Sequence, residues 1–381
     1  MKVLLISPYS VFPLSSGGQI RIVKLARNLS NLGVNVSLLT PYHFTQKTCL
    51  YDNEQFCVYQ IQYHFLLPFF LTYRLFPYSF LTSIHPGLAL MLRNFLNSFD
   101  IYQFEHTQFA SLIAKIPTNK IIIYNAHNVE YDYTRYECNN KFIESISGKR
   151  IYNLEKKMVG AASHIFSCSQ DDKKRLHTLY ATPLSKISIA PNGISPLQTV
   201  SNEKMLFEKF PKLFAFPRIA IYSGSNVVHN NVAVDFILEK IAPFLLKEYA
   251  FIIHGTCGKN FRKNTANNVF FDLDDQNFKD YVGPNTVGLN PVIQGSGTNL
   301  KLLHYFNHGL PVVSTPFGMR GYEDLKQYVT IASPNDFASI LKKGKFIQAP
   351  KFDEIDKKYG WHNIASHIKS VYSSLYLEKQ T

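Results

Sequence analysis

The chain lacks the signatures of several large classes of protein. It has no CxxC pair, no zinc-finger spacing, no aromatic RNP-type strand and no dense run of Lys and Arg. These absences argue against nucleic acid as a partner, and no spacing suggests metal ligands, so no metal ion is expected. The five cysteines are an odd number at wide spacing. They predict reduced thiols in a cytoplasmic protein.

A secretion signal and a membrane-spanning run are missing as well. The first apolar run ends at Pro8 and is too short for the core of a signal peptide. Two prolines and an arginine interrupt the longest apolar stretch, residues 65–81, so it falls short of the roughly 20 apolar residues that cross a bilayer. Its aromatic side chains suit an element that touches lipid headgroups, and burial in the protein core is the alternative.

Positive charge is in excess. The 381 residues carry a formal net charge of +13, with 46% hydrophobic and 18% charged residues, a composition typical of a folded protein. The excess predicts attraction to an anionic partner, such as a phosphorylated ligand or the acidic face of a membrane. Because the cations are scattered along the chain, solvated surfaces are the alternative explanation. The length allows two domains of roughly 100 to 200 residues each.

Short apolar runs alternate with helical patterns, and the alternation occurs twice. The first series precedes a polar stretch near residues 193–215, and the second series follows it. This rhythm predicts βαβ units, two parallel sheets and an α/β fold. The predicted domains are residues 1–195 and 196–359, with a last helix within residues 360–381. The predicted strands are residues 2–7, 35–40, 101–105, 120–126, 164–167, 218–222, 251–254, 269–271, 287–289 and 311–314.

The segment GSGTNLKLLHYFNHGLPVVSTPFG, residues 295–318, predicts a loop, a helix, a buried strand and a second glycine turn in succession. Ser296, Gly297 and Thr298 supply small residues and an N-cap hydroxyl at the start of the helix. A helix N-terminus of this kind suits a phosphate group. Lys301 follows one turn later, where it would either reach that phosphate or lie on the solvated face of the helix.

Two other turns have small residues after a predicted strand. Gly17 and Gly18 stand at the start of a predicted helix, where free backbone N–H groups favour an anion. The turn is not GxGxxG, so a dinucleotide cofactor is not expected. The turn after the first strand of the second series repeats this arrangement with Gly224, Ser225 and Asn226.

Polar side chains also follow two neighbouring strands directly. His127 comes immediately after residues 120–126, so its imidazole should lie at the carboxyl edge of the sheet. There it could hydrogen-bond a sugar hydroxyl or face a developing positive centre, which makes it the catalytic candidate. Glu130 stands beside it, and Glu105 and His106 follow the neighbouring strand. These three residues are further candidates on the same edge of the sheet.

These segments resemble the GT-B glycosyltransferases, specifically the large retaining group called family 4. Residues 1–40 resemble the start of that group, and residues 295–323, GSGTNLKLLHYFNHGLPVVSTPFGMRGYE, resemble its donor-binding signature. The resemblance is vague between residues 45 and 95. Other matching segments are residues 153–176, 189–194, 220–237 and 361–376.

The resemblance implies two Rossmann-like domains facing a central cleft, with the last helix returning to the first domain. It implies that the second domain holds a UDP- or GDP-sugar. It also implies that the first domain holds a glycan or lipid-linked acceptor, with Glu105, His106 and Glu130 on the acceptor side. A hexose would be transferred with retention, without a metal ion or other cofactor, for cell-surface polysaccharide or glycoconjugate synthesis. By position, His127 matches the histidine that faces the donor sugar, and Gly17 and Gly18 match the phosphate-side loop. Ser296 to Thr298 match the diphosphate-binding helix start.

The chain departs from the family pattern at two places. Family members commonly carry an acidic pair seven residues apart, the second grasping the ribose, and these positions fall near Gly297 and on His304. They also carry an Arg and a Lys in the loop after the first strand of the donor domain. Here that loop, residues 225–231, offers only His229, so Lys301, His229, Arg320 or the helix dipole would have to compensate.

The departures leave other functions open. One alternative is a catalytically degenerate GT-B protein that serves as a binding or partner subunit. Another is a different GT-B enzyme, such as a sugar-nucleotide epimerase. An active glycosyltransferase on the inner face of the membrane remains the leading interpretation.

Overall fold

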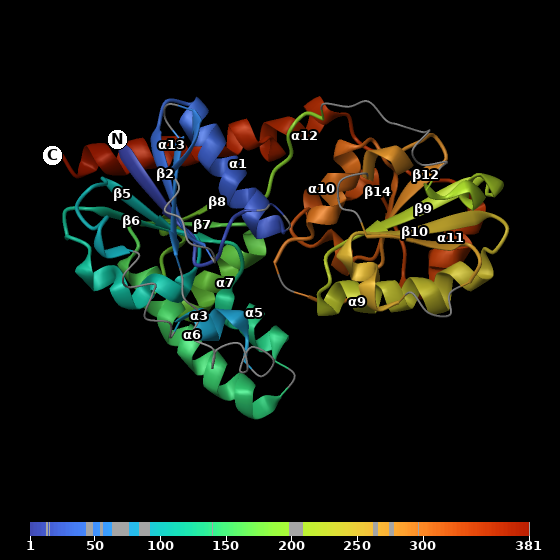
Figure 1. Ribbon diagram of the computed structural model, residues 1–381, viewed down its shortest axis with the longest axis horizontal. Coiled ribbons are helices and arrows are strands. Elements are labelled where there is room, and N and C mark those ends of the chain that lie inside the picture. The colour runs from blue at the N-terminus through green and yellow to red at the C-terminus, as the bar shows by residue number, and fades with distance from the viewer. Residues whose placement is uncertain are drawn as a thin grey trace. The chain divides into compact units, whose positions relative to one another are not determined.

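The computed structural model describes residues 1–12, 14, 16–42, 49–53, 56–62, 76–83, 92–138, 140–197, 209–261, 266–273, 278–295 and 297–380. The chain forms two compact units (Figure 1). Unit 1 comprises Met1–Gly193 and Lys358–Thr381, and unit 2 comprises Ile194–Lys357. These borders lie next to the predicted domain borders, whereas the acceptor and donor roles of the two domains stay predictions.

Unit 1 contains an eight-stranded sheet in the order β3-β4-β2-β1-β5-β6-β7-β8. All neighbouring strands are parallel except β3, which runs antiparallel to β4. The predicted parallel α/β fold is therefore confirmed, and the antiparallel edge and β8 are additions to it. The strands are β1 (Lys2–Ile6), β2 (Asn35–Tyr42), β3 (Cys49–Asn53), β4 (Phe56–Gln62), β5 (Ile101–Phe104), β6 (Ile121–Ala126), β7 (His164–Ser167) and β8 (Ile187–Ile189).

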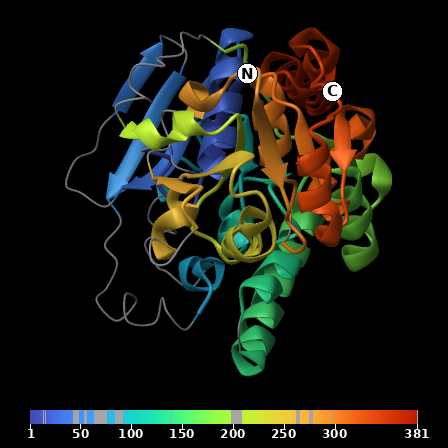
Figure 2. The ribbon, with the colours of Figure 1, turned by 90° about the vertical axis from the view of Figure 1, so that its right-hand side faces the viewer.

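Helices cover both faces of this sheet. One apolar core joins the sheet to α1 (Gly17–Asn31) and α13 (Trp361–Glu378), which lie side by side in Figure 1. The other core joins it to the 3-10 helix η1 (Thr107–Lys115) and to α6 (Lys141–Ala161). Figure 2 shows α6 as a long helix whose first turns extend away from the sheet. The remaining helices are α3 (Tyr78–Ser83), α5 (Glu130–Glu137) and α7 (Gln170–Tyr180).

Local sequence signals set the ends of these helices. Ser16 caps α1 in a reciprocal capping box with Gln19. Gly33 follows the helix with a φ of 84°, which favours glycine. Ser169 caps α7 by accepting a hydrogen bond from the backbone N–H of Asp172, as the sequence predicts.

Unit 2 contains a six-stranded parallel sheet in the order β11-β10-β9-β12-β13-β14. Val287 and Leu289 of β12 point into the core beneath α9, so Gly288 faces the opposite side. A Cβ on Gly288 would lie 2.6 Å from the ring of Tyr305, so glycine lets α10 pack closely there. The elements are β9 (Arg218–Ser223), β10 (Tyr249–His254), β11 (Val269–Asp272), β12 (Thr286–Asn290), β13 (Val312–Ser314), β14 (Val329–Ile331), α9 (Val228–Phe236), α10 (Leu300–Asn307) and α11 (Phe337–Lys343), with α12 (Phe352–Tyr359) at the border.

Each sheet has a point where the direction of strand addition reverses. In unit 1, β1 lies between β2 and β5, and in unit 2, β9 lies between β10 and β12. Open α/β sheets bind ligands beyond the carboxyl ends of the strands at such a point. The predicted site residues follow β1, β5, β6, β9 and β12, so they belong to these two edges.

The structure bears on two predictions from composition, one about the cysteines and one about membrane-spanning helices. Cys57 is disulfide-bonded, so the prediction that all cysteines are reduced is wrong at this residue, while Cys138, Cys168 and Cys257 are free. Among the described residues, no helix has both the length and the apolar character needed to span a membrane. Residues 65–75 of the predicted interfacial stretch lie outside the described residues.

Arg21 ties α1 to the end of the sheet in unit 1. Its guanidinium is 1% exposed. It donates to the Asn125 Oδ1 and the Ala190 carbonyl, both at 2.8 Å, and to the Pro191 carbonyl at 2.9 Å. A longer bond of 3.3 Å reaches the Asn192 Oδ1. Arginine therefore fixes the segment after β8 through a fork of donors that lysine cannot reproduce.

We expect Arg21→Lys to lower the free energy of unfolding by roughly 2 to 4 kcal/mol, because buried acceptors lose their donors. Urea denaturation monitored by circular dichroism measures this loss. Arg27→Lys on the exposed face of the same helix is the control, with an expected change within about 0.5 kcal/mol. Equal stability of the two variants would contradict the structural role of Arg21.

Candidate functional site

The first cluster lies at the carboxyl ends of β5 and β6 in unit 1. His127 Nε2 is 2.8 Å from Glu105 Oε2. The same carboxylate oxygen accepts from Asn125 Nδ2 at 2.8 Å, and Oε1 accepts from Gln103 Nε2 at 2.7 Å. Glu105 is 0% exposed and His127 is 8% exposed. The carboxylate therefore fixes the imidazole from behind.

This environment sets the charge and tautomer of His127. Burial, followed by the neighbouring His106, lowers the pKa of His127 to about 4, although Glu105 acts to raise it. Burial alone would raise the pKa of Glu105, but hydrogen bonds from His127 and Gln103 and nearby positive charge outweigh it, so its pKa is lowered. A carboxylate can only accept, so Nε2 of the neutral imidazole carries the proton. Nδ1 is left as an acceptor.

Gly18 lies against this free acceptor side. A Cβ on Gly18 would lie 3.5 Å from His127 Nδ1 and 2.5 Å from the hydroxyl oxygen of Tyr9. Glycine therefore leaves space between Tyr9 and His127 that any other residue would occupy. Gly17 begins α1 beside it. In the part of unit 1 that the structure describes, no hydrogen bond to Nδ1 of His127 is found.

His106 and Glu130 form a second pair next to His127. The His106 and His127 ring centroids are 4.5 Å apart. His106 Nδ1 is 2.5 Å from Glu130 Oε1, and its Nε2 is 3.1 Å from the hydroxyl of Tyr9. Glu105 and Glu130 are 0% and 2% exposed, so direct acceptor contact by these two carboxylates is not supported. They position the histidines instead, and His106 is the more exposed histidine, with 11% of its side chain exposed against 6% for His127.

Glu155 of α6 supports this pair from below. Its Oε1 accepts from the backbone N–H of Glu130 at 2.9 Å, and its Oε2 accepts from that of Tyr131 at 3.0 Å. The hydroxyls of Tyr124 and Tyr180 donate to the same carboxylate at 2.9 and 2.7 Å. Burial and the nearby charge of Glu130 raise the pKa of Glu155 to about 7. Glu155 thus accepts hydrogen bonds from backbone N–H groups at the start of α5 that have no partner within the helix.

The second cluster lies at the carboxyl ends of β9 and β12 in unit 2. Arg320 donates through NH1 to the Gly295 carbonyl at 3.0 Å and through Nε to the Gly297 carbonyl. Gly297 has a φ of 66°, in the left-handed region. Arg320 therefore shapes the loop before α10. Thr298 belongs to this loop, and Ser296 lies outside the described residues.

Lys301 reaches from α10 to the first turn of α9, which follows β9. Its Nζ donates to Asn230 Oδ1 at 2.6 Å and lies 5.2 Å from the centroid of the Tyr222 ring. Asn230 Nδ2 in turn donates to the Ser225 carbonyl at 2.8 Å. A Cβ on Gly224 would lie 2.8 Å from this amide, so glycine permits the close approach. Burial lowers the pKa of Lys301 to about 8.

Positive charge gathers around these loops. Burial, followed by Lys301 and Arg320, lowers the pKa of His229 to about 4, so this imidazole is neutral near pH 7. Asn226 is exposed, and its backbone N–H donates to the Thr256 hydroxyl at 2.9 Å. Lys301, one of the predicted site residues, thus contacts Asn230, which in turn contacts Ser225. Arg320 lies at the loop before α10.

His304 lies in a different environment on α10. Its ring centroid is 4.3 Å from that of Phe278 and 4.7 Å from that of His308. Burial and then His308 lower its pKa to about 3, so the ring is neutral. A neutral ring packed on aromatic neighbours cannot replace a carboxylate that accepts two ribose hydroxyls. A donor-binding role for His304 stays a prediction.

The N-cap of α10 differs from the prediction. The helix begins at Leu300, and the capping side chain is that of Asn299, which accepts from the backbone N–H of Lys301 at 3.4 Å. The expected hydroxyl cap within residues 296–298 is therefore wrong. Asn299 can cap because its amide is also fixed by donation to Asn290 Oδ1 at 2.8 Å.

Several residues of these clusters are not evident from sequence. Arg21, Asn125 and Glu155 act through partners far away along the chain, and no local spacing marks them. Asn230 lies a few residues after the predicted loop of Gly224 to Asn226, and this position is the sequence signal that could have identified it as a site residue. Within the described ranges, no group of three or more His, Cys, Asp or Glu side chains could hold a metal ion.

We expect His127 to titrate near pH 4 in histidine-ring NMR spectra, with the proton on Nε2 in the neutral form. Its folded pKa lies below the ordinary 6.5, so its contribution to stability is present above pH 6.5 and is lost as the pH falls towards 4. Glu105→Gln should lower the pKa further, because the carboxylate favours the charged imidazole. His127→Gln assigns the resonance. Titration of His127 near pH 6.5 would contradict the buried network.

Comparison with known proteins gives the sequence and fold context. The model of the family described as Glycosyltransferase Family 4 matches residues 15–196. No curated protein matches the chain. Sucrose-phosphate synthase from Thermosynechococcus elongatus is 12% identical, with a TM-score of 0.71 over 99% of this chain and 100% of that one.

Two further solved structures are similar over nearly the whole chain. WaaG, described as a glycosyltransferase involved in lipopolysaccharide biosynthesis, is 15% identical, with a TM-score of 0.64 over 96% of this chain and 94% of that one. HepE from Anabaena, in complex with UDP and glucose, is 14% identical, with a TM-score of 0.67 over 98% and 100% of the two chains. The predicted resemblance to the family 4 glycosyltransferases is confirmed over residues 15–196, and the solved structures share the GT-B fold that it implies.

Proposed function

We propose that the chain transfers a sugar from a nucleotide-diphosphate sugar to a glycan or lipid-linked acceptor with retention of configuration. Unit 2 would hold the donor and unit 1 the acceptor. The observation that carries the proposal is the contact of Lys301 with Asn230 at the start of α9, beyond the strand β9 where strand addition reverses. HepE is solved with UDP and with UDP-glucose, which supports a UDP-sugar as the first donor to test.

The unit 2 cluster suits a diphosphate for electrostatic reasons. Lys301 is hydrogen-bonded to a neutral amide rather than to a carboxylate, so its charge is not cancelled by that partner. Arg320 and the start of α10 stand at the same loop. Charge-assisted contacts to phosphate are among the stronger polar interactions. These groups would replace the Arg and Lys that residues 225–231 lack.

His127 would act on the sugar being transferred. Its Nδ1 can accept a hydrogen bond from a sugar hydroxyl, because Glu105 occupies the Nε2 side. A neutral imidazole also adds no positive charge next to an oxocarbenium-like centre, so it does not oppose charge development. The leaving diphosphate would stabilise that centre, and no metal ion or other cofactor is needed in this scheme.

A degenerate GT-B protein that binds a partner is the second candidate. The packing of His304 against Phe278 and His308 favours it, because no carboxylate is available at that position for a ribose. Such a protein would have lost donor affinity together with turnover. The nucleotide titration below separates the two candidates.

We place the proposed enzyme in the cytoplasm, at the inner face of the membrane, in cell-surface polysaccharide synthesis. The net charge of +13 supports attraction to anionic lipid. Co-sedimentation with vesicles checks this location. Equal binding to neutral and anionic vesicles would contradict it.

We expect UDP or GDP to bind with micromolar affinity in calorimetric titrations, and Lys301→Gln to weaken binding about tenfold or more, because a charge-assisted phosphate contact is lost. Since the pKa of Lys301 is lowered to about 8, affinity should fall as the pH rises above that value. Lys301→Arg should remove this pH dependence. Lys342→Gln at the exposed end of α11 is the control. Absence of binding by any nucleotide diphosphate would favour the partner protein.

We expect His127→Gln to lower kcat by roughly 10- to 100-fold, because one hydrogen bond to the reacting sugar is lost. The affinity for the nucleotide diphosphate should not change, since its proposed contacts lie in unit 2. Steady-state transfer assays and circular dichroism of the variant measure the two properties. Unchanged turnover in a folded variant would exclude His127 from catalysis.

A further inference from the structure

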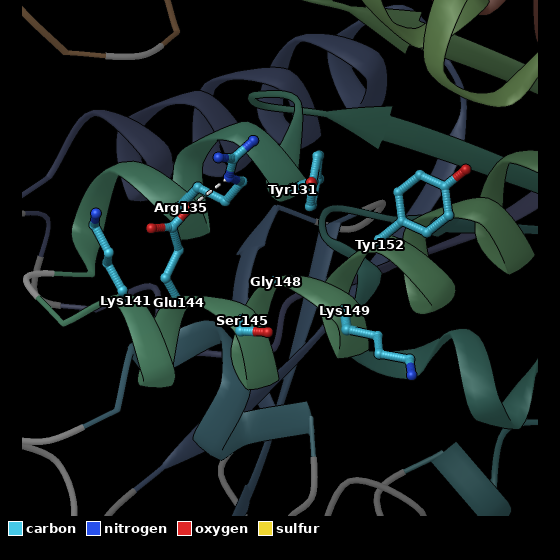
Figure 3. Close-up of a pocket in the computed structure, with 8 residues that line it drawn as sticks. All are labelled: Tyr131, Arg135, Lys141, Glu144, Ser145, Gly148, Lys149 and Tyr152. Carbon is cyan, nitrogen blue, oxygen red and sulfur yellow. Dashed lines mark hydrogen bonds and ion pairs between the residues drawn. The ribbon is translucent and has the colours of Figure 1, made fainter.

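A pocket of about 680 Å³ lies on unit 1 between α5 and α6 (Figure 3). Its lining residues come from these two helices, and Figure 3 shows the pair of Arg135 and Glu144 at one side and Lys149 with Tyr152 at the other. Neither the family pattern nor the two clusters above use these side chains. The lining residues are Tyr131, Arg135, Lys141, Glu144, Ser145, Gly148, Lys149 and Tyr152.

The pocket carries an excess of positive charge. Three cations and one carboxylate line it, which leaves a net charge of +2. Glu144 Oε1 accepts from Arg135 Nε at 2.7 Å, and the two side chains are 27% and 50% exposed. Lys141 and Lys149 are exposed as well. A doubly charged anion would therefore neutralise the lining.

Two tyrosine rings supply the apolar part of the pocket. The Tyr131 and Tyr152 ring centroids are 5.4 Å apart in an edge-to-face arrangement. The backbone N–H of Tyr131 is held by the buried carboxylate of Glu155, so this wall is fixed. Rings of this kind bind the apolar faces of sugars, and cations bind phosphate.

Gly148 leaves the floor of the pocket open. It is an interior residue of α6, where glycine is the poorest helix former except proline. A Cβ there would lie 3.5 Å from both Arg135 Cγ and Tyr131 Cε2, which is ordinary contact. Helix packing therefore does not require glycine at this position. The absence of a side chain at Gly148 makes the pocket deeper between Arg135 and Tyr131.

The pocket also adjoins the first cluster. Tyr131 directly follows Glu130, whose carboxylate binds His106, so both sites share the first turn of α5. A ligand at the pocket would contact the same turn that positions His106. This continuity places the pocket on the side of unit 1 proposed for the acceptor.

We propose that this pocket binds the phosphosugar head of the acceptor, with the phosphate on Arg135 and Lys141 at one side and the sugar against Tyr131, Tyr152 and Lys149. Its role as an acceptor site rests on the proposed function, whereas phosphosugar binding itself does not. The head group can belong to a soluble phosphosugar or to a lipid-linked one, since both present the same chemistry.

The test is calorimetric titration of the full chain with glucose 1-phosphate and with the same phosphosugar esterified to a short prenol, each with UDP in excess. UDP occupies the proposed donor site in unit 2. The binding of UDP therefore tests the proposed function, and the binding of the phosphosugar tests the pocket. The variants are Gly148→Ala, which fills the floor, and Lys141→Gln, which removes one of the two cations proposed to hold the phosphate. The control is Lys156→Gln, an exposed lysine of α6 that does not line the pocket.

We expect saturable binding that both variants weaken by about fivefold or more. The lysine variant loses one charged contact, and the methyl group of Gly148→Ala occupies the floor of the pocket. Lys156→Gln should leave the affinity unchanged. Gly148→Ala should not lower the thermal unfolding midpoint, because alanine favours the helix. A tenfold preference for the prenyl form would identify a lipid-linked acceptor, and equal affinity a soluble one. The proposal is overturned if neither phosphosugar binds, or if both variants bind like the wild type. Binding only to vesicles with phosphatidylglycerol would overturn it in favour of a membrane surface.

Discussion

The buried carboxylate of Glu105 is the constraint on which the unit 1 site depends. A charge at 0% exposure is costly unless hydrogen bonds and opposite charge offset its lost hydration. Gln103 of the preceding strand β5 and Asn125 of the neighbouring strand β6 donate to it, and Asn125 also accepts a hydrogen bond from the Arg21 guanidinium. His127 completes the set and is thereby held in one tautomer. The same charge that orients the histidine would be strongly destabilising without its partners.

Unit 2 uses charge in the opposite way. Its Lys301 donates to a neutral Asn amide, and its Arg320 donates to two backbone carbonyls of the loop before α10. A partly buried lysine with a neutral partner gains strongly from an incoming anion, because that partner does not cancel its charge. Unit 1 therefore presents a closed, preorganised network, and unit 2 presents a lysine whose charge its amide partner leaves in place. This division fits an edge that orients a sugar and an edge that holds phosphate.

Sequence periodicity predicted the frame of the molecule well and its networks poorly. The strands after which His127 and Gly224 stand were predicted because buried parallel strands are continuous apolar runs. Short edge strands such as β8 and β14 carry too few residues for that signal. The cap of α10 was misplaced because Asn299 is fixed by Asn290, which lies across a loop. The burial of Glu105 depends on residues from three separate segments, α1, β5 and the end of β6, so no local pattern could reveal it.

The link between Arg21 and Glu105 through Asn125 has a consequence for how this sequence can change over generations. Each of the three side chains satisfies a group that another leaves buried, so a substitution at one position creates an unsatisfied partner at the next. Descendants of this chain should therefore keep or lose the three together. Positions 21, 105 and 125 would then drift as one inherited unit, while the exposed residues around them vary independently.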